Sequence, residues 1–187
     1  AIAPVAELNL GGGFGIAYKP GDAPTDIETI AAEIVQAVAS ECTANGVDVP
    51  VLAFEPGRAI VGTSTFTLYS VGTTKEVTLD VEGETATRLY VSVDGGMSDN
   101  ARPALYGSDY HVRLANRISP EDAQLVRVAG KHCESGDIVV NADYLPADVE
   151  PGDLLAVAAT GAYCWSLSSN YNYLARPAVV AVTGGEA

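Results

Sequence analysis

The chain has 187 residues, of which 48% are hydrophobic and 18% charged, as in an ordinary globular protein. With 24 acidic against 10 basic residues its net charge is −14, which argues against nucleic acid as a partner because phosphate binding needs clustered lysine and arginine. The sequence contains no run of about 18 apolar residues, the length that a membrane-spanning helix needs. The 3 widely spaced cysteines indicate a reducing, cytoplasmic compartment rather than a disulfide framework.

The beginning of the chain has the pattern of a βα unit of a parallel sheet. A short apolar run, Val5–Leu10, ends in glycines and predicts a buried strand, and Val51–Phe54 predicts a second one. Between them, Asp26–Cys42 predicts the clearest helix, because its apolar residues recur at helical spacing. Thr25 and Glu28 predict a capping box at the start of that helix.

After Arg58 the chain becomes rich in short β-prone runs separated by glycines, prolines and charged turns, with residues 82–87 as a polar loop. We therefore expect the last βα units of a (β/α)8 barrel in residues 1–58. An all-β domain, a barrel or a sandwich, is expected in residues 59–187, with its last segment a candidate to return to the first barrel. The expected strands are Ala59–Tyr69, Glu76–Val81, Arg88–Val93, Tyr110–Leu114, Gln124–Val128, Asp137–Asn141, Leu154–Ala159 and Ala178–Val182.

A glycine run, residues 11–15, follows the first expected strand. Glycines let backbone N–H groups approach a phosphate, since no Cβ stands in the way. The same run would also suit a tight turn that binds nothing.

The sequence Glu55-Pro56-Gly57-Arg58 follows the second expected strand. A carboxylate at the C-terminal end of a barrel strand is more often catalytic than structural. The Pro56-Gly57 turn would place Arg58, whose guanidinium can bind a phosphate or carboxylate through two parallel hydrogen bonds. A surface salt bridge is the alternative interpretation of Arg58.

Two later motifs carry polar groups. Arg102 and Tyr106 bracket Pro103-Ala104-Leu105, and a second arginine suits a substrate with a second carboxylate, although Asp99 or Asp109 could pair with Arg102 instead. Cys133 lies in the polar turn Cys133–Asp137, whereas the other two cysteines are interpreted as small hydrophobic residues.

The glycine run, Glu55–Arg58, Asn100–Tyr106, Cys133–Asp137 and Gly161–Tyr163, in this order, resemble the C-terminal half of the diaminopimelate decarboxylases. These are pyridoxal 5'-phosphate enzymes of fold type III, and the resemblance covers nearly the whole chain. It implies a cytoplasmic homodimer with shared active sites that converts meso-diaminopimelate, an amino-acid substrate, to L-lysine and CO2. It also implies that the Schiff-base lysine lies upstream of the glycine run, so we expect no turnover from these residues alone.

The resemblance also assigns roles to individual residues. It assigns the cofactor phosphate to Gly11, Gly12 and Gly13, the pyridine nitrogen to Glu55, and further cofactor contacts to Pro56, Gly57, Arg58 and Tyr163. It assigns the substrate to Arg58, Arg102, Tyr106, Glu134 and Tyr163. Cys133 would reach across the dimer interface and deliver the proton after CO2 leaves.

Two alternatives remain at this point. An arginine- or ornithine-type decarboxylase has the same fold but binds a substrate whose far end bears no carboxylate. A non-catalytic β module is the second alternative, and ordered phosphate at the glycine run would argue against it.

Overall fold

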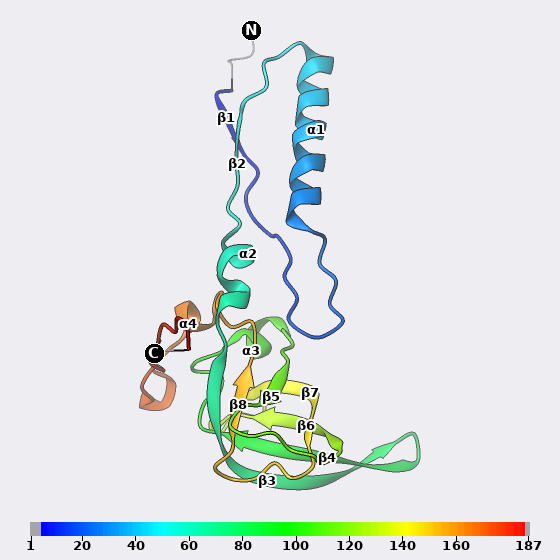
Figure 1. Cartoon of the computed structure of the whole chain (residues 1–187), viewed down its shortest axis with the longest axis vertical. Coiled ribbons are helices and arrows are strands. Elements are labelled where there is room, and N and C mark those ends of the chain that lie inside the picture. Colours follow the sequence, from blue (N-terminus) through cyan, green and yellow to red (C-terminus); the bar gives the residue numbers. More distant parts are fainter. Residues whose placement is uncertain (1–4, 186–187) are drawn as a thin grey trace.

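The computed structural model describes residues 5–185 and has two parts (Figure 1). The first part pairs strands β1 (Glu7–Asn9) and β2 (Val51–Ala53) in parallel, with the 19-residue helix α1 (Ile27–Asn45) between them in the chain. This is the predicted βα unit. Both strands are shorter than predicted, and they are not buried: Val51 is 67% exposed. Each strand has only the other as its hydrogen-bonded neighbour within the described residues.

Helix α1 begins differently from the prediction. The N-cap is Asp26, whose carboxylate accepts a hydrogen bond from the backbone N–H of Thr29, so the capping box of Thr25 and Glu28 was wrong. The helix ends at Gly46, which has the left-handed backbone (φ 61°) that glycine adopts at little cost. The apolar stripe predicted from Ile27, Ile30, Ala31, Ile34, Val35 and Val38 is confirmed only in part, because Ile27 and Val35 are exposed. The half-buried stripe consists of Ile30, Ala31, Ile34, Val38, Ala39 and Cys42.

The second part is a six-stranded sheet with the order β5-β8-β3-β4-β6-β7. Its neighbours are antiparallel except for β4 and β6, which are parallel. The two ends of the sheet meet, because Asp143 on β7 accepts a hydrogen bond of 2.9 Å from the backbone N–H of Val112 on β5. The strands are β3 (Thr67–Val81), β4 (Glu84–Val93), β5 (Val112–Leu114), β6 (Ala123–Ala129), β7 (Ile138–Pro146) and β8 (Leu154–Val157).

Short helices connect these strands and extend past the sheet. They are α2 (Gly57–Val61), η1 (Gly62–Ser64), α3 (Arg102–Tyr106), α4 (Cys164–Leu167) and η2 (Tyr171–Tyr173). None of the helices in residues 5–185 is long and apolar enough to cross a membrane.

Two strand predictions and one loop prediction were wrong in detail. The strand expected from Ala59 begins only at Thr67, because the residues after Arg58 belong to α2 and then to η1. The expected loop over residues 82–87 is mostly strand, because β3 and β4 form one long hairpin joined by Glu82 and Gly83. Both turn residues have positive φ (55° and 87°), as a two-residue hairpin turn that matches the strand twist requires. Residues 178–182 form no strand.

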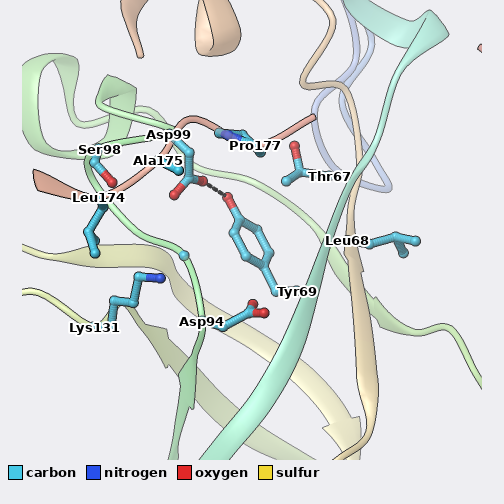
Figure 2. A pocket seen from close by; sticks show the side chains of 11 residues that line it. Thr67, Leu68, Tyr69, Asp94, Ser98, Asp99, Lys131, Leu174, Ala175 and Pro177 are labelled. Atoms are coloured by element: carbon cyan, nitrogen blue, oxygen red, sulfur yellow. Dashed lines mark hydrogen bonds between the residues drawn. The ribbon is translucent and has the colours of Figure 1, made fainter. Parts of the chain in front are cut away.

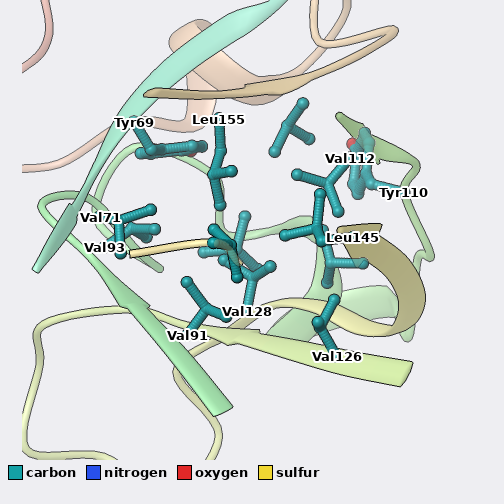
Figure 3. Packing of buried hydrophobic residues seen from close by; sticks show 14 of the residues in the cluster. Tyr69, Val71, Val91, Val93, Tyr110, Val112, Val126, Val128, Leu145 and Leu155 are labelled. Carbon is teal, nitrogen blue, oxygen red and sulfur yellow. The ribbon is translucent and has the colours of Figure 1, made fainter. Parts of the chain in front are cut away.

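The hydrophobic core lies inside this sheet and consists mainly of β-branched side chains (Figure 3). Core residues alternate along the strands, so that each pair two residues apart points to the same face. Burying one valine or leucine side chain contributes about 1.5–3 kcal/mol. The core includes Tyr69, Val71, Val91, Val93, Val112, Val126, Val128, Val140, Leu145, Leu155 and Val157.

Candidate active site

The glycine run and Glu55 meet where β1 and β2 end. The carbonyl of Gly11 accepts a hydrogen bond of 2.8 Å from the N–H of Glu55, and the side-chain amide of Asn9 donates to Glu55 Oε1 at 2.8 Å. A Cβ on Gly12 would lie 2.4 Å from the carbonyl oxygen of Glu55, so only glycine fits there. Gly13 has φ +88° and open space around its Cβ position. The strand ends therefore combine an unobstructed backbone with a carboxylate.

Arg58 is held against the glycine run. Pro56 is the N-cap of α2 and Gly57 its first residue, so these two residues start a helix rather than form an isolated turn. Arg58 donates from Nε to the carbonyl of Phe14 at 2.9 Å and from Nη2 to the carbonyl of Gly13 at 3.1 Å. Arg58 forms no salt bridge with any acid of residues 5–185, so the alternative interpretation is not supported there.

These groups suit a cofactor that bears a phosphate and a basic ring nitrogen. The backbone N–H groups of Gly12 and Gly13 have no acceptor within residues 5–185 and are open to an anion, whereas that of Gly11 donates to Asn9 Oδ1 at 2.7 Å. The positive charge of Arg58 lies beside them. Glu55 Oε1 is occupied by Asn9, while Oε2 has no partner within residues 5–185. A carboxylate held in this way can keep a pyridine nitrogen protonated.

Arg102 lies in a different place, at the start of α3, and is only 8% exposed. Its Nη1 donates to the hydroxyls of Tyr110 at 2.6 Å and Tyr18 at 3.0 Å. Its Cζ lies 5.0 Å from the ring centroid of Tyr18, 5.8 Å from that of Tyr110 and 5.5 Å from that of Tyr163. The guanidinium is thus surrounded by three aromatic rings, which attract a cation through their faces.

No carboxylate of the described residues forms an ion pair with Arg102. The two acids considered as partners are engaged elsewhere: Asp99 accepts from the Tyr69 hydroxyl and Asp109 pairs with Lys19. Those alternatives were therefore wrong. A nearly buried cation without an anionic partner is costly, so the site is suited to an incoming anion.

Tyr163 and Tyr106 flank the Arg102 cluster differently. Tyr163 has a left-handed backbone (φ 68°) just before α4, and its ring is half exposed while facing the guanidinium. Tyr106 lies one turn after Arg102 on α3 and is largely exposed, and its hydroxyl makes no hydrogen bond within residues 5–185.

The loop with Cys133 and Glu134 is exposed and lies on the sheet part. The Tyr171 hydroxyl donates to Glu134 Oε1 at 2.5 Å, and the Tyr171 ring lies 5.2 Å from that of His132. Tyr171 therefore holds Glu134. No hydrogen bond or ion pair of the described residues joins this loop to Arg102, Arg58 or the glycine run.

The Cys133 loop is anchored by a buried carboxylate. Asp137, 2% exposed, accepts hydrogen bonds from the backbone N–H groups of Met97 at 2.6 Å and His132 at 2.7 Å. A Cβ on Gly130 would lie 2.2 Å from Asp137 Oδ2, and one on Gly96 would lie 2.5 Å from Asp137 Oδ1. Glycine is therefore required at both positions for the carboxylate to reach its donors.

We expect Gly130→Ala to lower the free energy of unfolding by about 1–3 kcal/mol, because overpacking displaces Asp137 from its donors. Gly136→Ala, in the same loop, is the matched control, since nothing lies within 4 Å of its Cβ position. Urea denaturation of both variants measures the difference. Equal changes would contradict the anchoring role of Asp137.

A pocket of about 210 Å³ lies beside this region, between the start of β3, residues 94–99 and residues 174–177 (Figure 2). The Tyr69 hydroxyl points to the Asp99 carboxylate inside it, and burial raises the pKa of both side chains. None of the predicted site residues lines this pocket, so it is separate from the candidate site.

Family models match both parts of the chain. The pyridoxal-binding domain of pyridoxal-dependent decarboxylases matches residues 3–62, and their C-terminal sheet domain matches residues 60–161. The chain belongs to the pyridoxal-dependent decarboxylases. The family resemblance in the sequence is thereby confirmed, together with a sheet domain and the pyridoxal dependence of the family.

Individual relatives agree with this membership. Diaminopimelate decarboxylase of Mycobacterium tuberculosis is 57% identical over 99% of this chain and 41% of that protein, and the Bacillus subtilis enzyme is 48% identical over 96% and 39%. The crystal structure of diaminopimelate decarboxylase from M. jannaschii superimposes with a TM-score of 0.81 at 33% identity, covering 94% of this chain and 37% of that one. The chain spans about two fifths of the length of the curated relatives it matches.

Sequence reasoning missed Tyr18, Tyr110 and Tyr171. Tyr18 and Tyr110 lie 84 and 8 residues from Arg102, and nothing in the spacing links them. Tyr171 had one usable signal, since a polar aromatic residue in a short tyrosine-rich run suits a hydroxyl that bonds a nearby carboxylate.

Proposed function

We propose that this chain supplies part of the active site of a carboxy-lyase that converts meso-2,6-diaminopimelate to L-lysine and CO2. The observation that carries the proposal is Arg102, a nearly buried guanidinium without a carboxylate partner in the described residues. Relatives 47–57% identical to the chain are named diaminopimelate decarboxylase. The structure of one such enzyme is a complex with L-lysine.

The proposed architecture follows the family. Residues 1–58 would be the last βα units of a (β/α)8 barrel, and residues 59–187 a β-barrel domain. The parallel pair β1–β2 and the meeting of β5 with β7 support this proposal. The enzyme would act as a homodimer in the cytoplasm, a compartment that suits the free thiols of Cys42, Cys133 and Cys164.

The cofactor site would lie at the ends of β1 and β2. The phosphate would lie against Gly11, Gly12 and Gly13 and would be held by the backbone N–H groups of Gly12 and Gly13, since that of Gly11 donates to Asn9. Pro56 and Gly57 would place the charge of Arg58 beside them. Glu55 would keep the ring nitrogen protonated. Pyridoxal phosphate, when bound, supplies an electron sink for the bond that breaks, and Tyr163 would border it on the side of Arg102.

The far end of the substrate would be recognised by charge. Arg102 would bind the second carboxylate, with Arg58 and Tyr106 contributing, and Glu134 would bind the second ammonium group. Tyr171 holds one oxygen of Glu134, and the other has no partner within residues 5–185. This arrangement disfavours ornithine and arginine, because Arg102 would face a cation rather than an anion.

Cys133 would deliver the proton to the carbon that loses CO2. Its thiol is exposed. Within residues 5–185, no hydrogen bond or ion pair joins its loop to the glycine run of the same chain. Donation from the partner subunit of a homodimer would satisfy both facts.

The test is a comparison of substrates with the full-length gene product and added pyridoxal phosphate. Release of CO2 from meso-diaminopimelate should exceed that from L-ornithine or L-arginine by about 30-fold or more in kcat/KM, the factor that one charge-assisted contact of 2–3 kcal/mol supplies. A preference for ornithine or arginine would overturn the proposal. No decarboxylation of any amino acid would favour a non-catalytic module.

A further inference from the structure

The hydrogen bonds of Arg102 leave one edge of its guanidinium free. Nη1 carries two hydrogens, and the hydroxyls of Tyr18 and Tyr110 both accept from it, at 3.0 and 2.6 Å. Nε and Nη2 have no acceptor within residues 5–185. Through this free edge, Nε and Nη2 can bind one carboxylate by two parallel hydrogen bonds.

The tyrosines fix the guanidinium without cancelling its charge. Tyr110 is fully buried, and burial, followed by its contact with Cys164, raises the pKa of its hydroxyl, which therefore stays neutral. The faces of both rings lie within 6 Å of Cζ and stabilise the cation in place of an anion. An aspartate in either position would have neutralised Arg102 and removed its attraction for a ligand carboxylate.

The two tyrosines come from different parts of the chain. Tyr18 follows the glycine run in the pyridoxal-binding part, whereas Tyr110 lies beside β5 in the sheet part with Arg102. The ion pair of Lys19 with Asp109, at 2.5 Å, joins the same two segments one residue away from each tyrosine. The orientation of Arg102 therefore depends on how the two parts meet.

We infer that Tyr18 and Tyr110 are positioning residues, which orient the free edge of Arg102 toward the second carboxylate of the substrate. This inference rests on the proposed function. It adds two specificity-determining hydroxyls, one from each part of the chain, that never touch the substrate.

The test uses Tyr110→Phe and Tyr18→Phe in the holoenzyme of the full-length gene product. L-lysine, which keeps one carboxylate, and cadaverine, which has none, serve as competitive inhibitors. Each variant should raise the inhibition constant of L-lysine by about 10-fold, as expected for losing one hydrogen bond to a charged group. The inhibition constant of cadaverine should change less than about 2-fold, because it makes no contact with Arg102.

Tyr90→Phe is the matched control. The Tyr90 hydroxyl accepts from Arg127 Nη1 at 3.1 Å, and its ring lies 5.6 Å from Arg127 Cζ, so the same kind of pair is cut away from the site. This variant should leave both inhibition constants unchanged. Thermal melting of all three variants identifies any loss of folding. Tyr18 is only partly buried, so Tyr18→Phe still tests the inference if Tyr110→Phe, in the core, fails to fold.

Equal increases for L-lysine and cadaverine, or no increase for L-lysine, would overturn the positioning role. If the wild-type enzyme decarboxylates diaminopimelate normally in that case, the positioning inference fails alone. If the wild-type enzyme binds L-lysine no better than cadaverine, the carboxylate site itself is absent and the inference fails with it. If the wild-type enzyme does not turn over diaminopimelate but binds L-lysine better than cadaverine, only the proposed reaction is contradicted.

Discussion

Replacing Cys133 with alanine is expected to lower the turnover number for meso-diaminopimelate by about 100-fold or more, with little change in substrate affinity. The reason is that a positioned general acid accelerates proton transfer by about this factor. The exposed thiol makes few contacts that alanine would lose, so folding should be unaffected. Steady-state kinetics of the full-length gene product, with separate values of kcat and KM, measure the effect.

Cys42→Ala is the control for this prediction. Cys42 lies half buried on the apolar stripe of α1 and belongs to no predicted site. Its replacement should change stability only. Cys164 is unsuitable as a control, because its thiol lies 3.4 Å from the Tyr110 hydroxyl and so contacts the Arg102 cluster. Equal, mild kinetic effects at Cys133 and Cys42 would reject Cys133 as the proton donor.

Arg102→Ala is expected to weaken the binding of diaminopimelate by roughly 30–150-fold, since losing a charge-assisted contact to a buried carboxylate costs about 2–3 kcal/mol. The pyridoxal phosphate content should stay nearly unchanged, because the proposed phosphate site is at glycines 11–13, with Arg58 beside it. Substrate titration and the absorbance of the bound cofactor measure the two effects separately.

Arg127→Ala provides the comparison, because Arg127 also lies over a tyrosine ring, that of Tyr90. Its hydrogen bonds go to Tyr90 and Asn141, which are not predicted site residues. It should alter neither substrate affinity nor cofactor content. Arg58→Ala should instead reduce cofactor content, since Arg58 ties down the carbonyls of Gly13 and Phe14. Release of cofactor from the Arg102 variant with unchanged substrate affinity would assign Arg102 to the phosphate.

Several local elements of the fold could be predicted from the sequence. The apolar periodicity predicted α1, and the strand–helix–strand pattern predicted the parallel pair β1–β2. The tip of the hairpin β3–β4 was not predicted, because residues 82–87 are polar and have the composition of a loop. Residues 59–61 were wrongly assigned to a strand, since three apolar residues fit either a strand or a short helix.

The candidate site was predictable only in part. The resemblance named Arg102, but its partners come from residues distant in the chain, and only the packing of the two parts brings Tyr18 to it. The same limit applied to Tyr171, whose bond to Glu134 spans 37 residues. Local patterns specify elements, whereas contacts over such separations are set by the assembled fold.

Binding of the substrate's second carboxylate by Arg102 can be seen directly in a crystal structure of the full-length gene product with pyridoxal phosphate and L-lysine. We expect the lysine carboxylate to bind Nε and Nη2 of Arg102, with both tyrosine hydroxyls still on Nη1 and the α-ammonium group near Glu134. A lysine carboxylate bound at Arg58 and the glycine run, with the Nε–Nη2 edge of Arg102 left without ligand, would contradict it.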